Sequence, residues 1–337
     1  MEVIISCLHG IEDVCIKEAK ELTKGKAVKL SDSRIRVNCR DADVLKNNLR
    51  SGSRIFKLIG ELTFKSIEDI AKAVADNSKL FEEPIAVRCS RQGLQKFHSN
   101  DVEREVGEAL HYKGLSVDLK NPKTKIIIDV SDNKCYYGIL LAEDLNKREY
   151  RIKSTAQSIN STICYALVRL AGYKKGKVLL DPFSKDGTIV IEAAAFSNSL
   201  PLKFNKPVDT KEQTIYCSDP LLANVNNSET NSKLAGVNKA IKFSRYDIEW
   251  LDTKFGKSEI NYIVAVLPYH AGDRQKDAEK EYKELFYQAE FILSKTGKMA
   301  LLSHADLKPF IGKFKIVSET EILSGDIKYR AYVIARK

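Results

Sequence analysis

Long apolar runs are absent from this chain of 337 residues. A membrane-spanning helix needs roughly 20 consecutive and mostly uncharged apolar residues, and no window of the sequence approaches that. The first residues, MEVIISCLHGIEDVCIKEA, lack a basic segment followed by an apolar one and carry acidic side chains early. They therefore do not predict a secretory signal. We expect a cytoplasmic protein without membrane segments.

Cysteine and histidine are also scarce. The seven cysteines are odd in number and scattered, and no two of them form a C-x-x-C pair. The five histidines are equally dispersed. Disulfide frameworks and metal sites both depend on clustered spacings of these residues. We expect free thiols in a reducing compartment and no metal site.

Positive charge is in excess, with 55 Lys and Arg against 45 Asp and Glu and a formal net charge of +10. This excess favours an anionic partner such as nucleic acid. The alternative is a solvated basic surface of the kind that many stable proteins carry. The candidates for RNA contact lie in short basic stretches that also hold aromatic residues: Arg88, Arg91, Lys96, Lys123, Arg148 and Arg151.

The hydrophobic pattern changes along the chain, which is too long for one compact domain. Residues 1–60 predict a small α+β unit with strands at 3–7, 27–30 and 34–38 and helices at 10–22 and 41–49. Residues 61–150 predict a helix at 66–75, a strand at 85–89, a polar loop at 90–99 and a hairpin of strands 125–130 and 135–141. A further helix is predicted at 101–112, capped by Ser99 or Asn100. Beyond residue 178 strands and helices alternate, which is typical of a doubly wound parallel sheet.

The stretch 178–195, VLLDPFSKDGTIVIEAAA, is the most informative part of the chain. An apolar strand ends at Asp181, a short loop carries Gly187 and Thr188, and a helix of small residues follows. Such a corner brings backbone N–H groups and a helix N-terminus to a nucleotide-like ligand. The stretch therefore predicts a cofactor site.

This corner resembles the first motif of class I S-adenosylmethionine methyltransferases. It is most similar to the DPFxGSGTxxIEAA version found in RNA guanine-N2 methyltransferases. Where that family has Gly-Ser-Gly-Thr, this chain has Lys185, Asp186, Gly187 and Thr188, so a long cation replaces a glycine. The resemblance implies S-adenosylmethionine as the cofactor.

A second resemblance covers the first half of the chain. The segments PIAVRCSRQGLQKFHSNDVEREVGEAL and VDLKNPKTKIIIDVSDNKCYYGI look like the THUMP domain of tRNA-modifying enzymes. Together, the two resemblances imply four parts of the chain: a ferredoxin-like domain at 1–60, a THUMP domain at 61–145, a linker with a lead-in helix at 146–170 and a Rossmann-like methyltransferase domain at 171–337. The implied fold is α/β, with a seven-stranded C-terminal domain after an α+β region. The implied partner is tRNA, bound through backbone and shape; a small protein partner is also considered.

Three carboxylates stand where the first three strands of the C-terminal sheet end. By the resemblance, Asp181 orders the loop facing the methionine part of the cofactor, Asp219 accepts the ribose hydroxyls and Asp247 takes the adenine amino proton. Phe183, Gly187 and Thr188 complete the predicted cofactor site. The alternative for each aspartate is a turn or a helix cap. Three strand ends in register favour the cofactor interpretation.

The fourth strand ends differently from that of the family. Amino-group methyltransferases end it in Asp or Asn, two prolines and an aromatic residue that stacks on the extruded base. Here Val266 and Leu267 occupy the first two positions. Pro268, Tyr269 and His270 are the predicted catalytic residues. Valine has no acceptor for the target amine, and loss of such a hydrogen bond typically costs about 10²–10³ in rate.

Three functions remain open on the sequence. The first is a methyltransferase that forms N2-methylguanosine in tRNA, which the aspartates after the second and third strands favour. The second is a catalytically inactive relative that acts as a tRNA-binding module or partner subunit, which Lys185 and Val266 favour. The third is a Rossmann enzyme with another nucleotide ligand.

Overall fold

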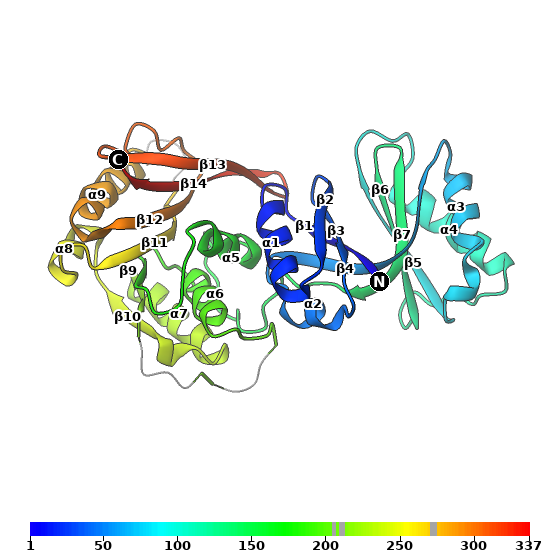
Figure 1. Ribbon diagram of the computed structural model, residues 1–337, viewed down its shortest axis with the longest axis horizontal. Helices are drawn as coiled ribbons and strands as arrows, with labels where there is room; N and C mark the ends of the chain where they lie inside the picture. Colours follow the sequence, from blue (N-terminus) through cyan, green and yellow to red (C-terminus); the bar gives the residue numbers. More distant parts are fainter. Residues whose placement is uncertain (204–206, 209–212, 270–274) are drawn as a thin grey trace. The chain divides into compact units, whose positions relative to one another are not determined.

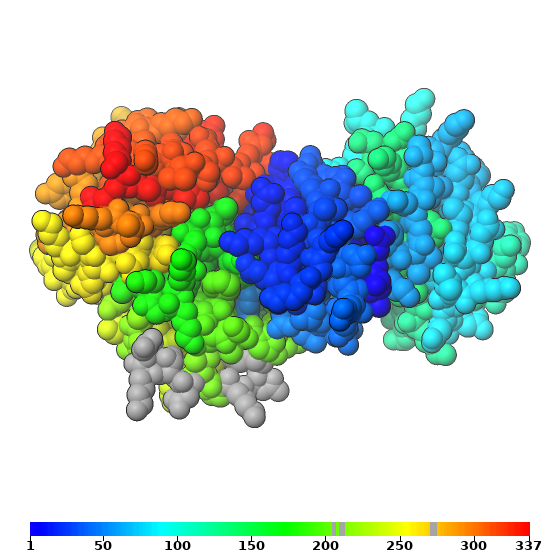
Figure 2. Space-filling model, viewed as in Figure 1, coloured from blue at the N-terminus to red at the C-terminus, as the bar shows by residue number. Residues whose placement is uncertain are grey.

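The computed structural model describes residues 1–203, 207–208, 213–269 and 275–337 (Figure 1). The chain divides into two compact units. The first contains Met1–Cys7, Ile16–Lys46 and Gly52–Leu145, and the second contains Leu8–Cys15, Asn47–Ser51 and Asn146–Lys337. The described residues of 146–337 are coloured green to red in the space-filling view (Figure 2). No helix among the described residues is long and apolar enough to cross a membrane.

The first unit is built on one seven-stranded sheet of order β2-β3-β1-β4-β7-β6-β5. Its strands are β1 (Glu2–Cys7), β2 (Lys26–Ser31), β3 (Arg34–Asn38), β4 (Gly52–Thr63), β5 (Ile85–Gln92), β6 (Thr124–Ser131) and β7 (Lys134–Ala142). The pattern did not predict β4, which pairs with β1 on one side and β7 on the other. The predicted domain boundary at residue 60 therefore falls inside a strand.

Helices α3 (Ile67–Ala75) and α4 (Ser99–Tyr112) cover part of this sheet, and α1 (Glu12–Thr23), α2 (Asp43–Asn48) and the short η1 (Ser78–Leu80) complete the helices near it. Val102, Val106 and Leu110 recur every four residues and are fully buried, as expected for one helix face. Ser99 and Asn100 lie inside α4, so the predicted cap is wrong. The helix begins after His98, whose N–H donates to the Asp101 carboxylate at 2.8 Å.

The loop predicted at 90–99 is shorter than expected. β5 continues to Gln92 because Arg91 and Gln92 pair with Val130 and Ser131 of β6 in a parallel ladder. A polar strand end of this kind carries no local signal, since its partner lies far away in the sequence.

The second unit contains a seven-stranded sheet of order β10-β9-β8-β11-β12-β14-β13. Its strands are β8 (Leu179–Asp181), β9 (Ile215–Asp219), β10 (Ile241–Arg245), β11 (Ile260–Val266), β12 (Leu293–Ser303), β13 (Phe314–Ser324) and β14 (Ile327–Arg336). The first five in chain order are parallel, and β14 and β13 form the antiparallel edge. The predicted α/β fold with a Rossmann-like sheet is confirmed. The strand order reverses between β8 and β11, where such sheets bind ligands.

The central strands β8 and β11 are buried on both faces, which explains their continuous apolar runs. The helices described beside this sheet are α5 (Ser161–Leu170), α6 (Thr188–Ser197), α7 (Leu222–Leu234), α8 (Leu251–Lys254) and α9 (Gln275–Ile292), with short turns η2 (Asn238–Ala240) and η3 (Ile248–Trp250). Tyr282 and Leu285 of α9 lie in one buried cluster with Leu301 of β12. α5 and α6 contact each other, as do α8 and α9.

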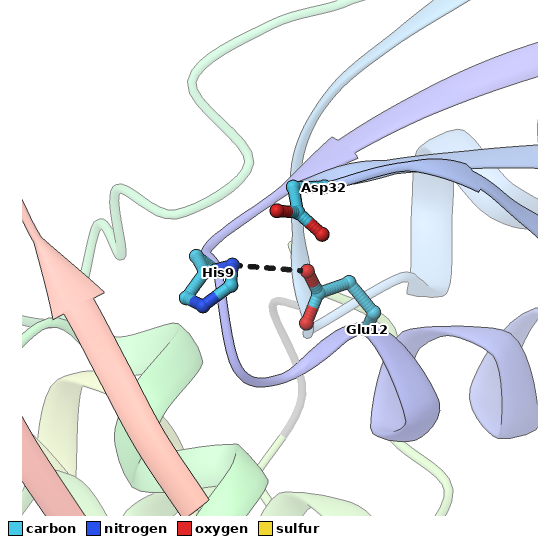
Figure 3. A group of neighbouring side chains, drawn as sticks. All are labelled: His9, Glu12 and Asp32. Carbon is cyan, nitrogen blue, oxygen red and sulfur yellow. Dashed lines mark ion pairs between the residues drawn. The ribbon is translucent and has the colours of Figure 1, made fainter.

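A short N-terminal segment belongs to this second unit. The His9 carbonyl accepts the Leu323 N–H of β13 at 3.2 Å. At Gly10, where φ is +93°, an added Cβ would lie 2.0 Å from the Glu321 carbonyl oxygen. His9 also pairs with the buried Glu12 at 3.5 Å (Figure 3). Only glycine permits this close approach of two backbones.

Candidate cofactor and base-binding site

The loop after β8 is held by its own carboxylates. Asp181 is 1 % exposed, and its Oδ1 accepts the Phe183 N–H at 3.1 Å. Burial raises the pKa of Asp181 above its ordinary value. Phe183 is buried in the core cluster beneath the sheet. Asp181 and Phe183 thus set the direction in which the loop leaves the strand.

Gly187 begins α6 with φ +78°, in the left-handed region that favours glycine. An added Cβ would lie 2.7 Å from the Cβ of Ser228 in α7. Asp186, at the position of the family's serine, accepts hydrogen bonds from the N–H and the Oγ1 of Thr188 at 3.2 and 2.8 Å. The altered loop therefore still closes tightly on the start of the helix.

The three predicted carboxylates do reach the same edge of the sheet. Asp219 pairs in register with Arg245 of β10, and Asp181 pairs with Cys217 of β9. Asp219 is 4 % exposed; its Oδ1 accepts the Leu221 N–H and its Oδ2 accepts the Lys185 N–H. Oδ1 also accepts the Asn224 side-chain amide at 2.9 Å, so the lone pair that remains for a ligand is on Oδ2.

Asp247, two residues beyond β10, is exposed. It borders a hollow of about 400 Å³ whose wall includes Pro220, Arg245, Tyr246, Trp250, Thr253 and Lys254. Trp250 is 56 % exposed there. An aromatic face beside a carboxylate suits a purine with an exocyclic amine.

Lys185 occupies the other end of the site. Its backbone has φ +54°, its side chain is buried, and its Nζ donates to the Val266 carbonyl at 2.9 Å. The cavity that it lines together with Asp181, Thr188 and Val266 measures only about 10 Å³. Burial lowers the pKa of Lys185, although the Asp181 carboxylate opposes the shift.

These residues fit S-adenosylmethionine unequally along its length. The carboxylates of Asp219 and Asp247 suit its ribose and adenine. At the end that the resemblance assigns to its methionine part, the cavity lined by the Lys185 side chain holds only about 10 Å³.

The end of β11 is packed rather than polar. Val266 and Leu267 are 8 % and 2 % exposed, and the Leu267 N–H donates to the Leu302 carbonyl at 2.9 Å. The Pro268 carbonyl accepts the Tyr282 hydroxyl at 2.5 Å. Tyr269 is 45 % exposed, as a residue that stacks on a base must be. His270 lies outside the described residues.

One predicted RNA contact is wrong. The side chain of Arg148 is 1 % exposed, and its Nε donates to Glu192 Oε1 at 2.7 Å. Arg50 and the Tyr150 hydroxyl bind the same carboxylate at 2.9 Å each. Three residues later, Arg151 pairs with Asp186 at 2.8 Å. The sequence signal was present, since Glu192 is a lone acid in an apolar helix and a buried acid requires cationic partners.

The basic residues of the first unit are divided between two ends of the sheet. Arg91 lies over the Phe97 ring, 5.6 Å from its centroid, and Lys96 is exposed nearby in the chain. Arg88 is 40 % exposed and lies 3.8 Å from Glu103. Lys123 immediately precedes β6, whose first residue pairs with Ile85 at the opposite end of β5. The structure therefore groups Arg91 with Lys96 and separates both from Lys123.

Sequence reasoning missed one residue at the mouth of the site. His304 directly follows β12, and its ring centroid lies 4.5 Å from that of Tyr269. Its position at the carboxyl end of a parallel strand was a usable signal, because ligand sites gather there.

Comparisons with known proteins agree with this geometry. Residues 61–140 match the THUMP domain model. A tRNA (guanine(6)-N2)-methyltransferase from Methanocaldococcus jannaschii is 27 % identical over 289 residues, covering 74 % of this chain and 75 % of that protein. A Thermus thermophilus protein of the same description is 39 % identical over 110 residues, which cover 32 % of this chain and only 33 % of the Thermus protein.

A solved structure, TrmN from Thermus thermophilus, superposes over 100 % of this chain and 99 % of its own, with a TM-score of 0.81 and 26 % identity. These relatives lend no support to a catalytically inactive module. They agree with S-adenosylmethionine as the cofactor of the family.

The model of the RMKL-like methyltransferase domain matches residues 148–325, more than half of the chain. That range contains β8 through β13, the glycine loop and all three strand-end carboxylates. The resemblance drawn from the sequence is confirmed: the chain belongs to the RMKL-like methyltransferase family and carries a THUMP domain before its methyltransferase domain.

Proposed function

We propose that this protein transfers a methyl group from S-adenosylmethionine to the N2 atom of a guanine in tRNA. The observation that carries the proposal is the juxtaposition of Asp181 and Asp219 with the exposed Tyr269 at the carboxyl edge of one parallel sheet. The tRNA assignment rests on the relatives, two of which are described as tRNA (guanine(6)-N2)-methyltransferases. The cofactor supplies the methyl group.

Each residue has a distinct part in this proposal. Asp219 accepts a ribose hydroxyl through the remaining lone pair of Oδ2, and Asp247 accepts the adenine amine. Gly187 and Thr188 keep the loop close to the methionine part, with Asp181 and Phe183 shaping it from below. Pro268 and Tyr269 present the base, and His270 is retained as a candidate catalytic residue.

RNA is held by the first unit in this proposal. Arg88, Arg91 and Lys96 meet phosphates, with Lys123 as a further candidate. Arg151 is a candidate from the second unit, where it is paired with Asp186. We retain the proposed division into a ferredoxin-like part, a THUMP part, a linker and a methyltransferase domain. Cytoplasmic action suits the seven cysteines, which are all described and all free.

The test combines cofactor binding with methyl transfer. Purified full-length protein is titrated with S-adenosylmethionine by calorimetry. It is then incubated with tritiated cofactor and unmodified tRNA, and the product nucleoside is identified. U6 snRNA is tested in parallel, because relatives in mammals are described as U6 snRNA (guanine-N(2))-methyltransferases. Absence of cofactor binding at millimolar concentration would overturn the proposal.

The decisive variant is Asp219→Ala. Loss of charge-assisted hydrogen bonds to the ribose should cost roughly 1.5–3 kcal/mol of binding free energy, or about 10- to 150-fold in affinity. RNA affinity should stay near wild type. The matched control is Asp326→Ala, an exposed aspartate in the turn between β13 and β14. Equal cofactor affinity in both variants would remove Asp219 from the site.

A further inference from the structure

Three aromatic rings form a continuous row beside the proposed active site. Tyr269 and His304 have ring centroids 4.5 Å apart at 41°, and His304 and Tyr329 have centroids 4.6 Å apart at 47°. Tyr269 is 45 % exposed, whereas Tyr329 is 7 % exposed. The row therefore leads from the base-stacking position into the protein interior, with His304 in the middle.

The inner end of the row is fixed by the sheet. Tyr329 lies in β14, where it pairs with Ile322 of β13. His304 directly follows β12, which pairs with β14 through Ser303 and Arg330. Both residues are thus placed by backbone ladders, whereas Tyr269 lies in the segment after β11.

The surroundings of the His304 ring favour its neutral form. Burial and the Lys185 ammonium both lower its pKa, against a hydrogen bond with the Lys328 backbone. The ring also packs between the rings of Tyr269 and Tyr329, which limits its orientation. A neutral, oriented ring can pack against a phenol as an aromatic pair.

We propose that His304 is a positioning residue that holds the Tyr269 ring ready to stack on the target base. This inference rests on the proposed function. With one face of Tyr269 packed against His304, only the other face remains for a purine. The ring is then ordered before the base arrives, so less conformational entropy is lost when the base stacks.

Three substitutions separate this role from simple packing. His304→Ala removes the ring, His304→Phe keeps an aromatic ring, and His304→Leu keeps bulk without one. Tyr287→Ala, at an aromatic residue of α9 that is 68 % exposed, is the matched control. Thermal unfolding of every variant shows which of them remain folded.

Methyl transfer to tRNA should respond in a specific pattern. We expect His304→Ala to lower the single-turnover rate by about tenfold or more, since a misplaced reacting group is costly. The KM for tRNA and the cofactor affinity should change less than about twofold, because the contacts that hold the RNA and the cofactor lie elsewhere. His304→Phe should recover most of the rate, and His304→Leu should not. Equal rates for the Phe and Leu variants would overturn the proposal.

A second readout does not depend on turnover. 3-Fluorotyrosine placed at position 269 reports its neighbour by ¹⁹F NMR, because an adjacent ring shifts and orders the fluorine signal. His304→Ala should move and broaden that signal, and Tyr287→Ala should leave it unchanged. An unchanged signal in His304→Ala would overturn the proposal even if the wild type methylated no RNA. An inactive wild type with the expected NMR change would instead count against the proposed function.

Discussion

Among its individual residues, the proposed site combines positions of the family motif with replacements that change its chemistry, and Lys185 is the replacement that bears on the cofactor. Gly187 and Asp219 stand at the positions proposed to bind the nucleoside part of the cofactor. Lys185 places a buried cation at the end proposed for the methionine part, and its Nζ donates to the Val266 carbonyl. S-Adenosylmethionine carries a sulfonium cation, so a nearby ammonium opposes its binding by charge as well as by volume.

Lys185→Gly should therefore raise affinity for the cofactor. Glycine frees the cavity, removes the like charge and accepts the local φ of +54° without strain. We expect S-adenosylmethionine to bind about tenfold tighter, a gain of about 1.4 kcal/mol, and the uncharged sulfur analogue S-adenosylhomocysteine to gain less. Calorimetry of both ligands measures this.

The control for this change is Ser258→Gly. Ser258 is an exposed residue of the same unit with φ +61°, so its replacement relieves similar backbone strain away from the site. Its cofactor affinity should match wild type. If Lys185→Gly also matches wild type, Lys185 does not obstruct the pocket.

At the element scale, the segment before α5 fastens α6 at two points. Arg151 pairs with Asp186 just before the helix, and Arg148 pairs with Glu192 within it. Arg50 reaches the same Glu192. Because α6 begins at the cofactor loop, these ion pairs fix the loop together with the helix.

Glu192→Gln should destabilise the protein strongly. Glu192 is fully buried between two arginines, and breaking such a pair typically costs about 3–5 kcal/mol, since it leaves uncompensated buried charge. Glu229→Gln, which breaks a surface pair with Lys233, should cost under about 1 kcal/mol. Urea unfolding at pH 7 compares the two, and similar losses would contradict the assignment.

The Glu192 carboxylate also predicts that the fold loses stability at low pH. Burial alone would raise the pKa of Glu192, but Arg148 and Arg50 hold it at about 2, below the ordinary 4.5. A depressed carboxyl pKa stabilises the fold above about 4.5, and that contribution is lost as pH falls toward about 2. Wild-type stability should drop across this window, whereas Glu192→Gln should show a smaller drop.

At the scale of the whole molecule, chemistry and RNA binding are assigned to different units. The methyltransferase sheet carries the strand-end carboxylates and Tyr269, and the first unit carries Arg88, Arg91 and Lys96. A basic surface recognises phosphates without reading bases, so it supplies affinity rather than chemistry.

RNA affinity of the full chain should fall steeply with salt. Each phosphate contact releases counterions, and several contacts lower affinity by about 10³ or more between low and moderate salt. Lys96→Ala should reduce the slope of log affinity against log salt by about 1. Lys79→Ala, at an exposed lysine of η1, should not. Filter binding at several salt concentrations tests this, and equal slopes for both variants would remove Lys96 from the RNA surface.

The class of fold, and the edge of the sheet proposed to hold the site, could be predicted from the amino-acid sequence. Alternating apolar strands and helices indicate a parallel sheet, and the carboxyl ends of parallel strands meet at one edge. Asp181, Asp219 and Asp247 could therefore be placed together from local pattern alone. Tyr269 followed from the motif that ends the fourth strand.

The contacts that those side chains make could not be read from the sequence. β4 joins the two halves of the first sheet by pairing with β1 and β7, and β7 lies far away in the sequence. No local hydrophobic periodicity therefore predicts this pairing. Arg148 resembles a surface cation in the sequence, yet it is buried against Glu192 of α6. Lys185 and His304 acquire their roles from strands that lie side by side only in the folded sheet. Local sequence records propensity and polarity, whereas burial and pairing depend on contacts between distant segments.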